Sequence, residues 1–153
     1  MAFLKRTDST NKDFIELVKA LDDYLAIIDG DDHAYYHQFN KTRSLKNVVV
    51  AYENEIPIGC GALKPYDSDS QEVKRMYVVP LQRGKGIARQ ILNELEKWAI
   101  ELSYSKCILE TGKKQSDAVG LYTTSGYYII PNYGQYEKME TSVCFEKQLN
   151  RNQ

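Results

Sequence analysis

The chain has 153 residues, of which 42% are hydrophobic and 27% are charged. A chain of about 150 residues usually forms one domain and can bury roughly two thirds of its unfolded surface, which excludes a peptide that needs metal or disulfide bonds to fold. Twenty Lys and Arg residues against 21 Asp and Glu residues give a net charge of -1. Because this balance creates no global positive field, we expect neither nucleic acid nor a membrane as a partner. We expect a single domain over residues 1–153, in which any anion site is local.

The cysteines and the N-terminus indicate a reducing compartment. Cys60, Cys107 and Cys144 cannot all pair within one chain, and none has a C-x-x-C spacing or lies near a histidine pair. We therefore expect buried free thiols. The segment from Met1 to Arg6 lacks the apolar stretch of a signal peptide, and no window approaches the roughly 18 apolar residues of a membrane span. These features predict a cytoplasmic protein.

The N-terminal quarter predicts a short strand and two helices. The strand is expected from Phe3 to Arg6. Thr10 and Asp13 form a near capping box, and the apolar residues after them recur at helical spacing up to Gly30, which suits a C-cap. A second, shorter helix is expected through Tyr36 to about Lys41. Asp31 and Asp32 are the candidates for its N-cap.

The rest of the chain predicts a mixed sheet with helices packed on it. From Gly84 the apolar period becomes that of a long amphipathic helix, with a broad stripe from Ile87 to Leu102. The element order β, α, α, β, β, β, α, β, α, β, β excludes a helix bundle and a sandwich. Strands are expected at 47–52, 58–63, 72–79, 107–109, 127–130 and 142–145, a turn at 54–57, and a further helix at 117–124 closed by Gly126.

The stretch from Val78 to Ala88 is the most informative part of the sequence. A predicted strand ends there in a short glycine-containing loop that opens the longest predicted helix. A helix start leaves about four backbone N–H groups unpaired and carries roughly half a positive charge, so it can bind an anion. Glycine at positions 84 and 86 removes side chains that would keep a diphosphate from the amides, and it tolerates the positive φ of an amide nest. The alternative is an ordinary glycine turn.

Basic residues gather around this loop in the sequence. No acidic residue lies between Val73 and Asn93, which predicts a local positive patch in a chain of net charge -1. The basic residues of this stretch are Lys74, Arg75, Arg83, Lys85 and Arg89.

Spacing restricts the phosphate ligand. A Walker loop needs G-x-x-x-x-G-K-[ST], which this chain lacks. A dinucleotide fingerprint would place its third glycine at position 89, where Arg89 stands. Glu110, at the end of the next predicted strand, mimics the ribose-binding acid of such a site. A dinucleotide-binding enzyme is therefore one alternative, which a comparison of CoA with NAD in a thermal-shift experiment would test.

Two segments match patterns of a known family. Arg83-Gly84-Lys85-Gly86-Ile87-Ala88 fits an R-x-x-G-x-A signature after the expected strand, and the segment from Gln115 to Tyr127 looks like N-x-x-A-x-x-L-Y-x-x-x-G-F. Gln115 replaces Asn and Tyr127 replaces Phe in the second pattern. Together they resemble the Gcn5-related N-acetyltransferases (GNAT). The resemblance implies an α/β (α+β) fold with a mixed, mostly antiparallel sheet of about six to seven strands, about four flanking helices and splayed central strands.

The resemblance also implies acetyl-CoA, and hence CoA, as a co-substrate that is bound where two neighbouring strands splay, with no metal. On this analogy the diphosphate lies on the loop amides, and the pantetheine arm pairs with the exposed edge of the preceding strand, as peptides do in strand addition. The cofactor-binding residues expected are Met76, Tyr77, Val78, Arg83, Gly84, Lys85, Gly86, Ile87, Ala88, Gln115 and Tyr122.

Catalytic candidates follow from the same resemblance. Amine acetylation requires a neutral nitrogen, a donor for the charge that develops on the thioester oxygen, and an acid for the departing thiolate. Tyr122 occupies the position of the family's acid, and the N–H of Val78 occupies that of the oxyanion donor. Glu72 matches the place where some relatives have a general base that works through water. The alternatives are a core aromatic residue for Tyr122 and a solvated strand start for Glu72.

Weaker signals bear on the acceptor. Aspartates gather beside tyrosines at the junction of the first two predicted helices, where they would suit a cationic amine or simply cap the turn. Tyrosines from Tyr127 to Tyr136 suggest an aromatic acceptor pocket, or exposed β surface. His33 and His37 share a predicted helix face, but a zinc site needs a third ligand. The junction residues are Asp22, Asp23, Asp29, Asp31 and Asp32, with Tyr24, Tyr35 and Tyr36.

These observations predict an acetyl-CoA-dependent N-acetyltransferase. The acetyl group would pass to a primary amine of a small molecule or peptide by direct attack in a ternary complex. The amine is the expected partner, and a homodimer is left open. The second hypothesis is a non-catalytic acyl-CoA binding or sensing domain, from which release of free thiol would distinguish the enzyme. Fold and cofactor do not specify the acceptor.

Overall fold

The computed structural model describes residues 2–30 and 44–150, which form a seven-stranded sheet in the order β1-β2-β3-β4-β5-β7-β6. Neighbouring strands are antiparallel except for β4 and β5, which are parallel. The strands are β1 (Phe3–Thr7), β2 (Asn47–Glu53), β3 (Ile56–Pro65), β4 (Ser70–Val78), β5 (Lys106–Gly112), β6 (Tyr128–Ile130) and β7 (Ser142–Gln148). Within the described residues the helices are α1 (Lys12–Asp29), α3 (Ile87–Glu101) and α4 (Ser116–Thr124), with 3-10 turns η2 (Pro80–Gln82) and η3 (Gly134–Tyr136).

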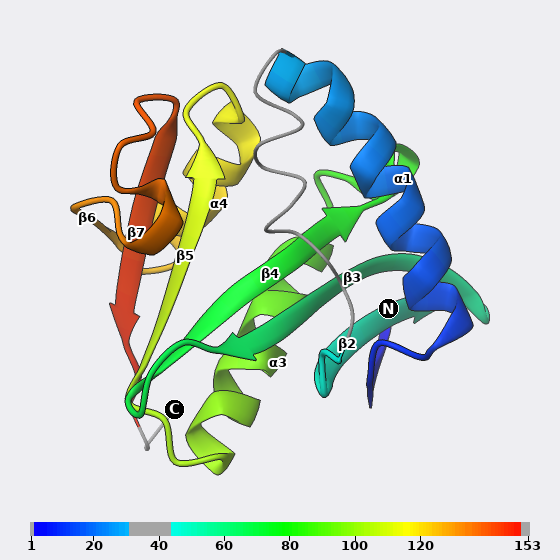
Figure 1. The fold of residues 1–153 in the computed structure, drawn as a ribbon. Coiled ribbons are helices and arrows are strands. Elements are labelled where there is room, and N and C mark those ends of the chain that lie inside the picture. The colour runs from blue at the N-terminus through cyan, green and yellow to red at the C-terminus, as the bar shows by residue number, and fades with distance from the viewer. Residues whose placement is uncertain (1, 31–43, 151–153) are drawn as a thin grey trace.

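Helices cover both faces of the sheet. Figure 1 shows α1 in front of the central strands and α3 behind them. Strand β2 is buried on both sides: Val48 and Val50 pack in the cluster that includes α1, whereas Val49 and Ala51 pack in the cluster that includes α3. Such a run of apolar residues is expected for a strand covered on both faces. The predicted mixed, mostly antiparallel sheet is therefore confirmed.

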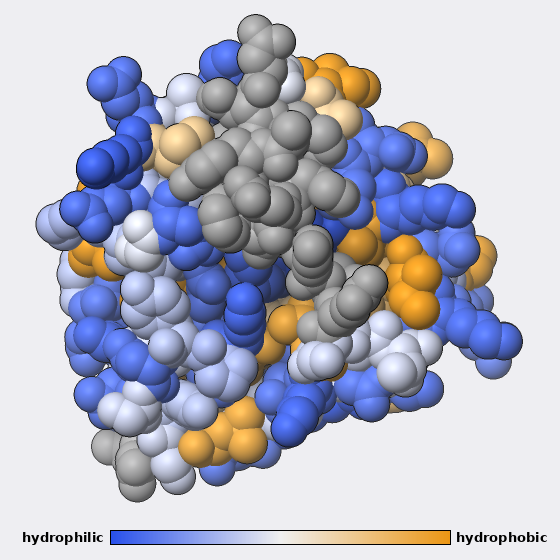
Figure 2. Space-filling view, viewed as in Figure 1, coloured by the Kyte–Doolittle hydropathy of each residue, from blue (hydrophilic) through white to orange (hydrophobic). Residues whose placement is uncertain are grey.

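Polar residues dominate the surface on the α1 side. In Figure 2 hydrophobic residues form small, separate groups on this face. No helix within residues 2–30 and 44–150 is both long and apolar enough to cross a membrane.

The start of α1 corrects a sequence prediction. The N-cap is Asn11, whose Oδ1 accepts the N–H of Phe14 at 2.9 Å, rather than Thr10. The N–H and hydroxyl of Thr10 are donated instead to the Asp8 carboxylate, an acceptor that the capping-box pattern does not consider. At the other end, the predicted C-cap at Gly30 is confirmed, with φ 56°. The expected second helix, with its caps Asp31 and Asp32, lies outside the described residues.

Two glycines of β3 allow α3 to approach the sheet closely. A Cβ atom at Gly61 would lie 2.5 Å from the sulfur of Met76 and 2.9 Å from Cγ2 of Ile91, and one at Gly59 would lie 2.9 Å from the carbonyl oxygen of Tyr77. Any side chain at these positions would push α3 or β4 away. The two glycines thus position the start of α3 beside the end of β4.

The central strands splay, and β4 is bulged. Strands β4 and β5 pair over Ser70–Glu72 and Lys106–Ile108 and then diverge (Figure 1). In β4, Arg75 has φ 59°, and the register with β3 shifts between Cys60 and Ala62. An extra residue in one strand bends that strand and interrupts its pairing. The bulge therefore accompanies the gap between the upper halves of β4 and β5, and it confirms the predicted splayed strands.

The three cysteines are buried and free, as predicted. Burial raises the pKa of the Cys60 and Cys107 thiols to about 12. Both therefore remain protonated and weakly nucleophilic near neutral pH.

Candidate active site

A cavity of about 680 Å³ occupies the gap between β4 and β5. The upper half of β4, the end of β5, α4 and one side of α1 contribute to its walls. It runs between two ends, which we name by their residues. The loop end comprises residues 82–89, all of which except Lys85 line the cavity, and the carboxylate end comprises Glu72, Lys74 and Glu110.

At the loop end, backbone amides precede the first hydrogen bond of α3. Gly84 and Gly86 have φ 78° and 80°, and a Cβ atom at either would meet nothing within 4 Å. Gly86 is the N-cap and has no side chain to occupy the amides, so the helical bonds begin with the N–H of Gln90 on the carbonyl of Gly86 at 3.1 Å. The N–H groups of Ile87, Ala88 and Arg89 lie before that bond. The loop end therefore has the geometry of an anion site.

The predicted positive patch is only partly correct. Arg83, Lys85 and Arg89 are exposed around the loop, but Lys74 and Arg75 are buried on β4. The prediction was wrong for Lys74 and Arg75 because both lie within the extended strand β4, away from the loop that follows it. The patch at the loop end therefore has three basic residues instead of five.

Two of the three exposed cations tie the loop to its surroundings. Nε of Arg83 donates to the carbonyl of Val78 at 2.8 Å, and its guanidinium lies 5.4 Å from the ring centroid of Tyr24 on α1. Arg89 binds the C-terminal end of α4, with NH2 2.7 Å from Oγ1 of Thr124. Arg83 thus connects the loop to β4 and α1, while Arg89 connects the two helices that flank the cavity.

The edge of β4 faces the gap at Val78. This residue lies opposite Gly59, while the N–H of Val79 donates to the carbonyl of Ile58 at 2.9 Å. That pattern makes Val78 and Gly59 a non-hydrogen-bonded pair, in which the N–H and C=O of Val78 point away from β3. Its carbonyl accordingly accepts from Arg83. The Val78 N–H therefore lies on the side of β4 from which β5 has diverged.

Tyr122 of α4 combines a buried ring with an uncommitted hydroxyl. It is 5% exposed and packs at 5.7 Å from the ring centroid of Tyr127 and 6.0 Å from that of Phe145. Among the residues that the structure describes, none forms a hydrogen bond with its hydroxyl, although Tyr122 lines the cavity. Burial, and to a smaller extent Glu110, raises the pKa of Tyr122. The hydroxyl thus retains its proton near neutral pH.

Glu72 is held from two sides at the carboxylate end. It is 4% exposed, so the alternative of a solvated strand start is wrong. Its Oε2 accepts a hydrogen bond from the hydroxyl of Tyr133 at 2.6 Å, and its Oε1 lies 4.0 Å from Nζ of Lys74. A buried carboxylate needs such partners to remain charged.

Lys74 and Glu110 extend this charged group across the gap. Burial lowers the pKa of Lys74, while the charges of Glu72 and Glu110 act in the opposite direction. Nζ of Lys74 lies 3.4 Å from the hydroxyl of Tyr136, and Glu110 accepts a hydrogen bond from Ser142 at 2.7 Å. Two carboxylates and one ammonium therefore share the carboxylate end. The sequence pattern predicted Lys74 in a positive patch at the loop and did not indicate this arrangement.

Of the predicted acidic cluster, Asp22 has a clear role in the described structure. It accepts from the guanidinium of Arg75 at 2.5 Å, and the Arg75 side chain is 1% exposed. This pair fixes α1 to the bulge of β4. Tyr24 lines the cavity, as does Leu21. The remaining candidates of this region lie outside the described residues: Asp31, Asp32, His33, Tyr35, Tyr36 and His37.

Gln115 is at the N-cap of α4, and its side chain does not cap the helix. Nε2 of Gln115 lies 3.2 Å from the position that a Cβ atom would take at Gly112, beside the end of β5. All of the predicted cofactor-binding residues except Lys85 line the cavity. No cluster of potential metal ligands occurs within residues 2–30 and 44–150.

The sequence model of the acetyltransferase (GNAT) family matches residues 14–127. The chain belongs to the GNAT family. The GNAT resemblance predicted from residues 83–88 and 115–127 is thereby confirmed, and the chain is an N-acetyltransferase of the GNAT type.

Curated relatives and solved structures agree with this assignment. An IAA acetyltransferase of Azospirillum brasilense is 32% identical over 143 residues, which cover 88% of this chain and 90% of the relative. A provisionally assigned acyl-CoA N-acyltransferase of Klebsiella pneumoniae has a TM-score of 0.82 and 27% identity, covering 98% of this chain and 99% of that one. A GNAT family acetyltransferase of Elizabethkingia anophelis, solved with acetyl-CoA bound, has the same fold, with a TM-score of 0.68, 18% identity and coverage of 97% and 98%.

Proposed function

We propose that this GNAT enzyme transfers an acetyl group from acetyl-CoA to a primary amine of a small molecule or peptide by direct attack in a ternary complex. The observation that carries the proposal is that one cavity is lined by the loop end, Tyr122 and Glu72. The amides can bind a diphosphate, Tyr122 can protonate a departing thiolate, and Glu72 can accept a proton from an amine.

The shape of the loop end fits CoA. The amides before the first bond of α3 would bind the diphosphate, and the glycines at 84 and 86 leave space for its close approach. The pantetheine arm would run along Met76, Tyr77 and Val78, whose strand is unpaired on that side after Glu72. Gln115 would approach the arm from α4.

Three groups would perform the chemistry. The Val78 N–H would donate to the thioester oxygen as negative charge develops there. Tyr122 would give its proton to the departing sulfur, because its hydroxyl stays protonated and has no partner among the described residues. Glu72 would accept the proton of the attacking amine, directly or through one water.

Release of free CoA tests the proposal. Purified protein is mixed with acetyl-CoA and one amine at a time, and free thiol is measured over time. A separate reaction contains IAA, because the Azospirillum relative is named an IAA acetyltransferase. We expect one acceptor class to accelerate thiol release, with mass spectrometry finding a product heavier by one acetyl group.

Calorimetry with CoA provides the matching control. Binding of CoA without thiol release for any acceptor would favour the non-catalytic acyl-CoA binding domain. No binding of CoA at all would contradict the proposal for the loop end.

A further inference from the structure

Tyr133 contacts the proposed general base from a distant part of the chain. It lies between β6 and η3, 61 residues from Glu72, and its hydroxyl donates to Oε2 of Glu72 at 2.6 Å. A hydrogen bond to an ionised oxygen is short and about twice as strong as one between neutral groups. The contact is therefore a substantial interaction of that carboxylate.

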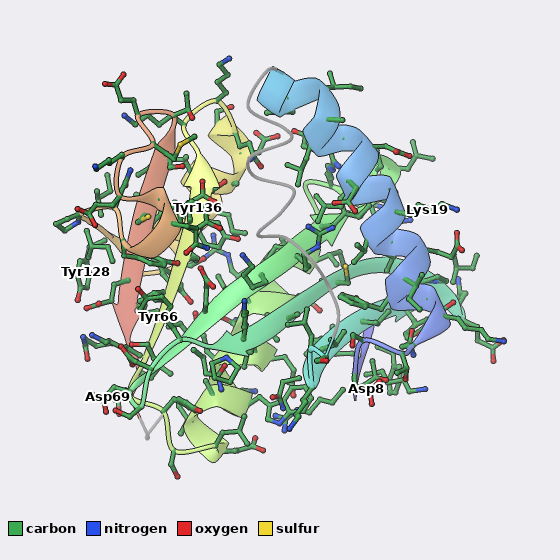
Figure 3. The ribbon with its side chains drawn as sticks, viewed as in Figure 1. Asp8, Lys19, Tyr66, Asp69, Tyr128 and Tyr136 are labelled. Atoms are coloured by element: carbon green, nitrogen blue, oxygen red, sulfur yellow. The ribbon has the colours of Figure 1, made fainter. Side chains whose placement is uncertain are left out.

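The ring of Tyr133 is held in place by its neighbours. It makes edge contacts with Tyr66, at 5.0 Å between centroids, and with Tyr136, at 5.9 Å. Figure 3 shows Tyr66 and Tyr136 on the same face of the sheet, in front of β5 and β7. The preceding residue, Asn132, donates to the carbonyls of Met139 and Ser142 at 3.0 and 3.2 Å. The hydroxyl is thus presented to Glu72 by a segment anchored at both the ring and the backbone.

Electrostatics assign the proton of this bond to Tyr133. Burial, and then the charge of Glu72, raises the pKa of Tyr133, so the phenol remains the donor and the carboxylate the acceptor. Donation to the charged form of a carboxylate favours that form. Within residues 2–30 and 44–150, the other titratable groups around Glu72 are Lys64 on β3, Lys74 on β4, Glu110 on β5, Tyr136 in η3 and Cys144 on β7.

We propose that Tyr133 is a positioning residue, which keeps the Glu72 carboxylate ionised and in one orientation for accepting the proton of the amine. The proposal rests on the proposed function, because it presumes that Glu72 is the base. Tyr133 itself would touch neither acetyl-CoA nor the reacting atoms, which separates its role from that of Tyr122.

The test compares Tyr133→Phe with Tyr66→Phe by recording kcat/KM against pH. Tyr133→Phe removes one oxygen and keeps the ring, so Glu72 loses the hydrogen-bond donor at Oε2. We expect the acid limb of the profile to move to higher pH, because the lost hydrogen bond favours the charged form of the carboxylate. Tyr66→Phe, which changes the adjacent ring but not the bond to Glu72, should reproduce the wild-type profile. The Kd for CoA should be unchanged in both variants.

An acid limb of Tyr133→Phe that coincides with the wild-type limb would overturn the proposal. The double variant Glu72→Gln with Tyr133→Phe supplies a second test, which asks whether Tyr133 acts only through the Glu72 carboxylate. It should have the same kcat/KM as Glu72→Gln alone, and a further tenfold loss would also overturn the proposal.

Activity of Glu72→Gln distinguishes failure of the proposed base from failure of the Tyr133 proposal. If this variant keeps wild-type activity, Glu72 is not the base and the proposed function of that residue fails, and the Tyr133 proposal fails with it. If Glu72→Gln is inactive while Tyr133→Phe keeps the wild-type profile, the failure belongs to Tyr133 alone.

Discussion

The loop end and the carboxylate end of the cavity differ in what builds them. The loop end is made of backbone amides from one continuous stretch, with glycines at 84 and 86 that leave the amides accessible. The carboxylate end is made of side chains from β4 and β5, and Tyr133 from the segment after β6 supports it through its hydrogen bond to Glu72. Backbone geometry tolerates most changes of side chain, whereas a buried charged group depends on each partner. The two ends should therefore respond differently to substitution.

Replacing Tyr122, which lines the cavity, should have the largest effect. Tyr122→Phe keeps the buried ring but removes the proposed acid, so turnover at saturating acetyl-CoA should fall by about 10²- to 10⁴-fold. The Kd for CoA should stay within about twofold of wild type, since the loop amides are untouched. Steady-state kinetics and calorimetry measure the two quantities.

Tyr104→Phe is the matched control, because Tyr104 packs against the same core from outside the cavity. It should leave turnover unchanged. A Tyr122→Phe enzyme with wild-type turnover would remove the acid role and leave Tyr122 as a core aromatic residue.

The ion pair beneath the β4 bulge should have the next largest effect. Asp22→Ala leaves the Arg75 guanidinium buried without its partner, and we expect a loss of about 3 kcal/mol in the free energy of unfolding. Urea denaturation followed by fluorescence measures this loss. Asp23→Ala, at the exposed neighbouring position on α1, should cost less than about 0.5 kcal/mol. Equal losses in the two variants would mean that the pair does not hold α1 on β4.

A methyl group at the loop end should weaken CoA binding selectively. Gly86→Ala adds a side chain at φ 80°, so the backbone must leave the left-handed conformation that exposes the amides. We expect the Kd for CoA to rise by about tenfold, which corresponds to a loss of about 1.4 kcal/mol in binding free energy. Gly30→Ala is the control, since Gly30 has φ 56° and equally open surroundings but lies at the C-cap of α1. It should lower stability to a similar extent and leave the Kd unchanged.

The contrast between the two ends also explains what the sequence could predict. The strand, glycine loop and helix that form the loop end are consecutive in the sequence, so the local pattern of residues 78–88 was enough to predict them. The β2–β3 hairpin was predicted for the same reason, although the structure alone gives the positive φ of Asn54 and Glu55, 51° and 67°. Local patterns therefore predicted the loop end and most elements of the fold.

Contacts across long sequence distances were not predictable in this way. Tyr133 reaches Glu72 only because β7 returns beside β5, and nothing in either neighbourhood encodes that pairing. The bulge at Arg75 depends on the register between β3 and β4 and on its partner Asp22. Competition for hydrogen bonds likewise moved the cap of α1 from Thr10 to Asn11. The first two features are decided by tertiary contacts, whereas the cap is decided by a local competition between side-chain acceptors.

The smallest expected effect tests whether charge or backbone geometry dominates at the loop end. Lys85 is exposed, and its Nζ lies 3.2 Å from Oε1 of Gln82. Because exposed charges interact weakly and are screened by salt, Lys85→Ala should raise the Kd for CoA by only about two- to fivefold. Lys97→Ala, an exposed lysine further along α3, should not change the Kd. Calorimetry at low and high salt measures both variants, and the effect of Lys85→Ala should shrink as salt rises. A tenfold or larger loss that persists in high salt would mean that this side chain, rather than the amides of Ile87 and Ala88, holds most of the diphosphate charge.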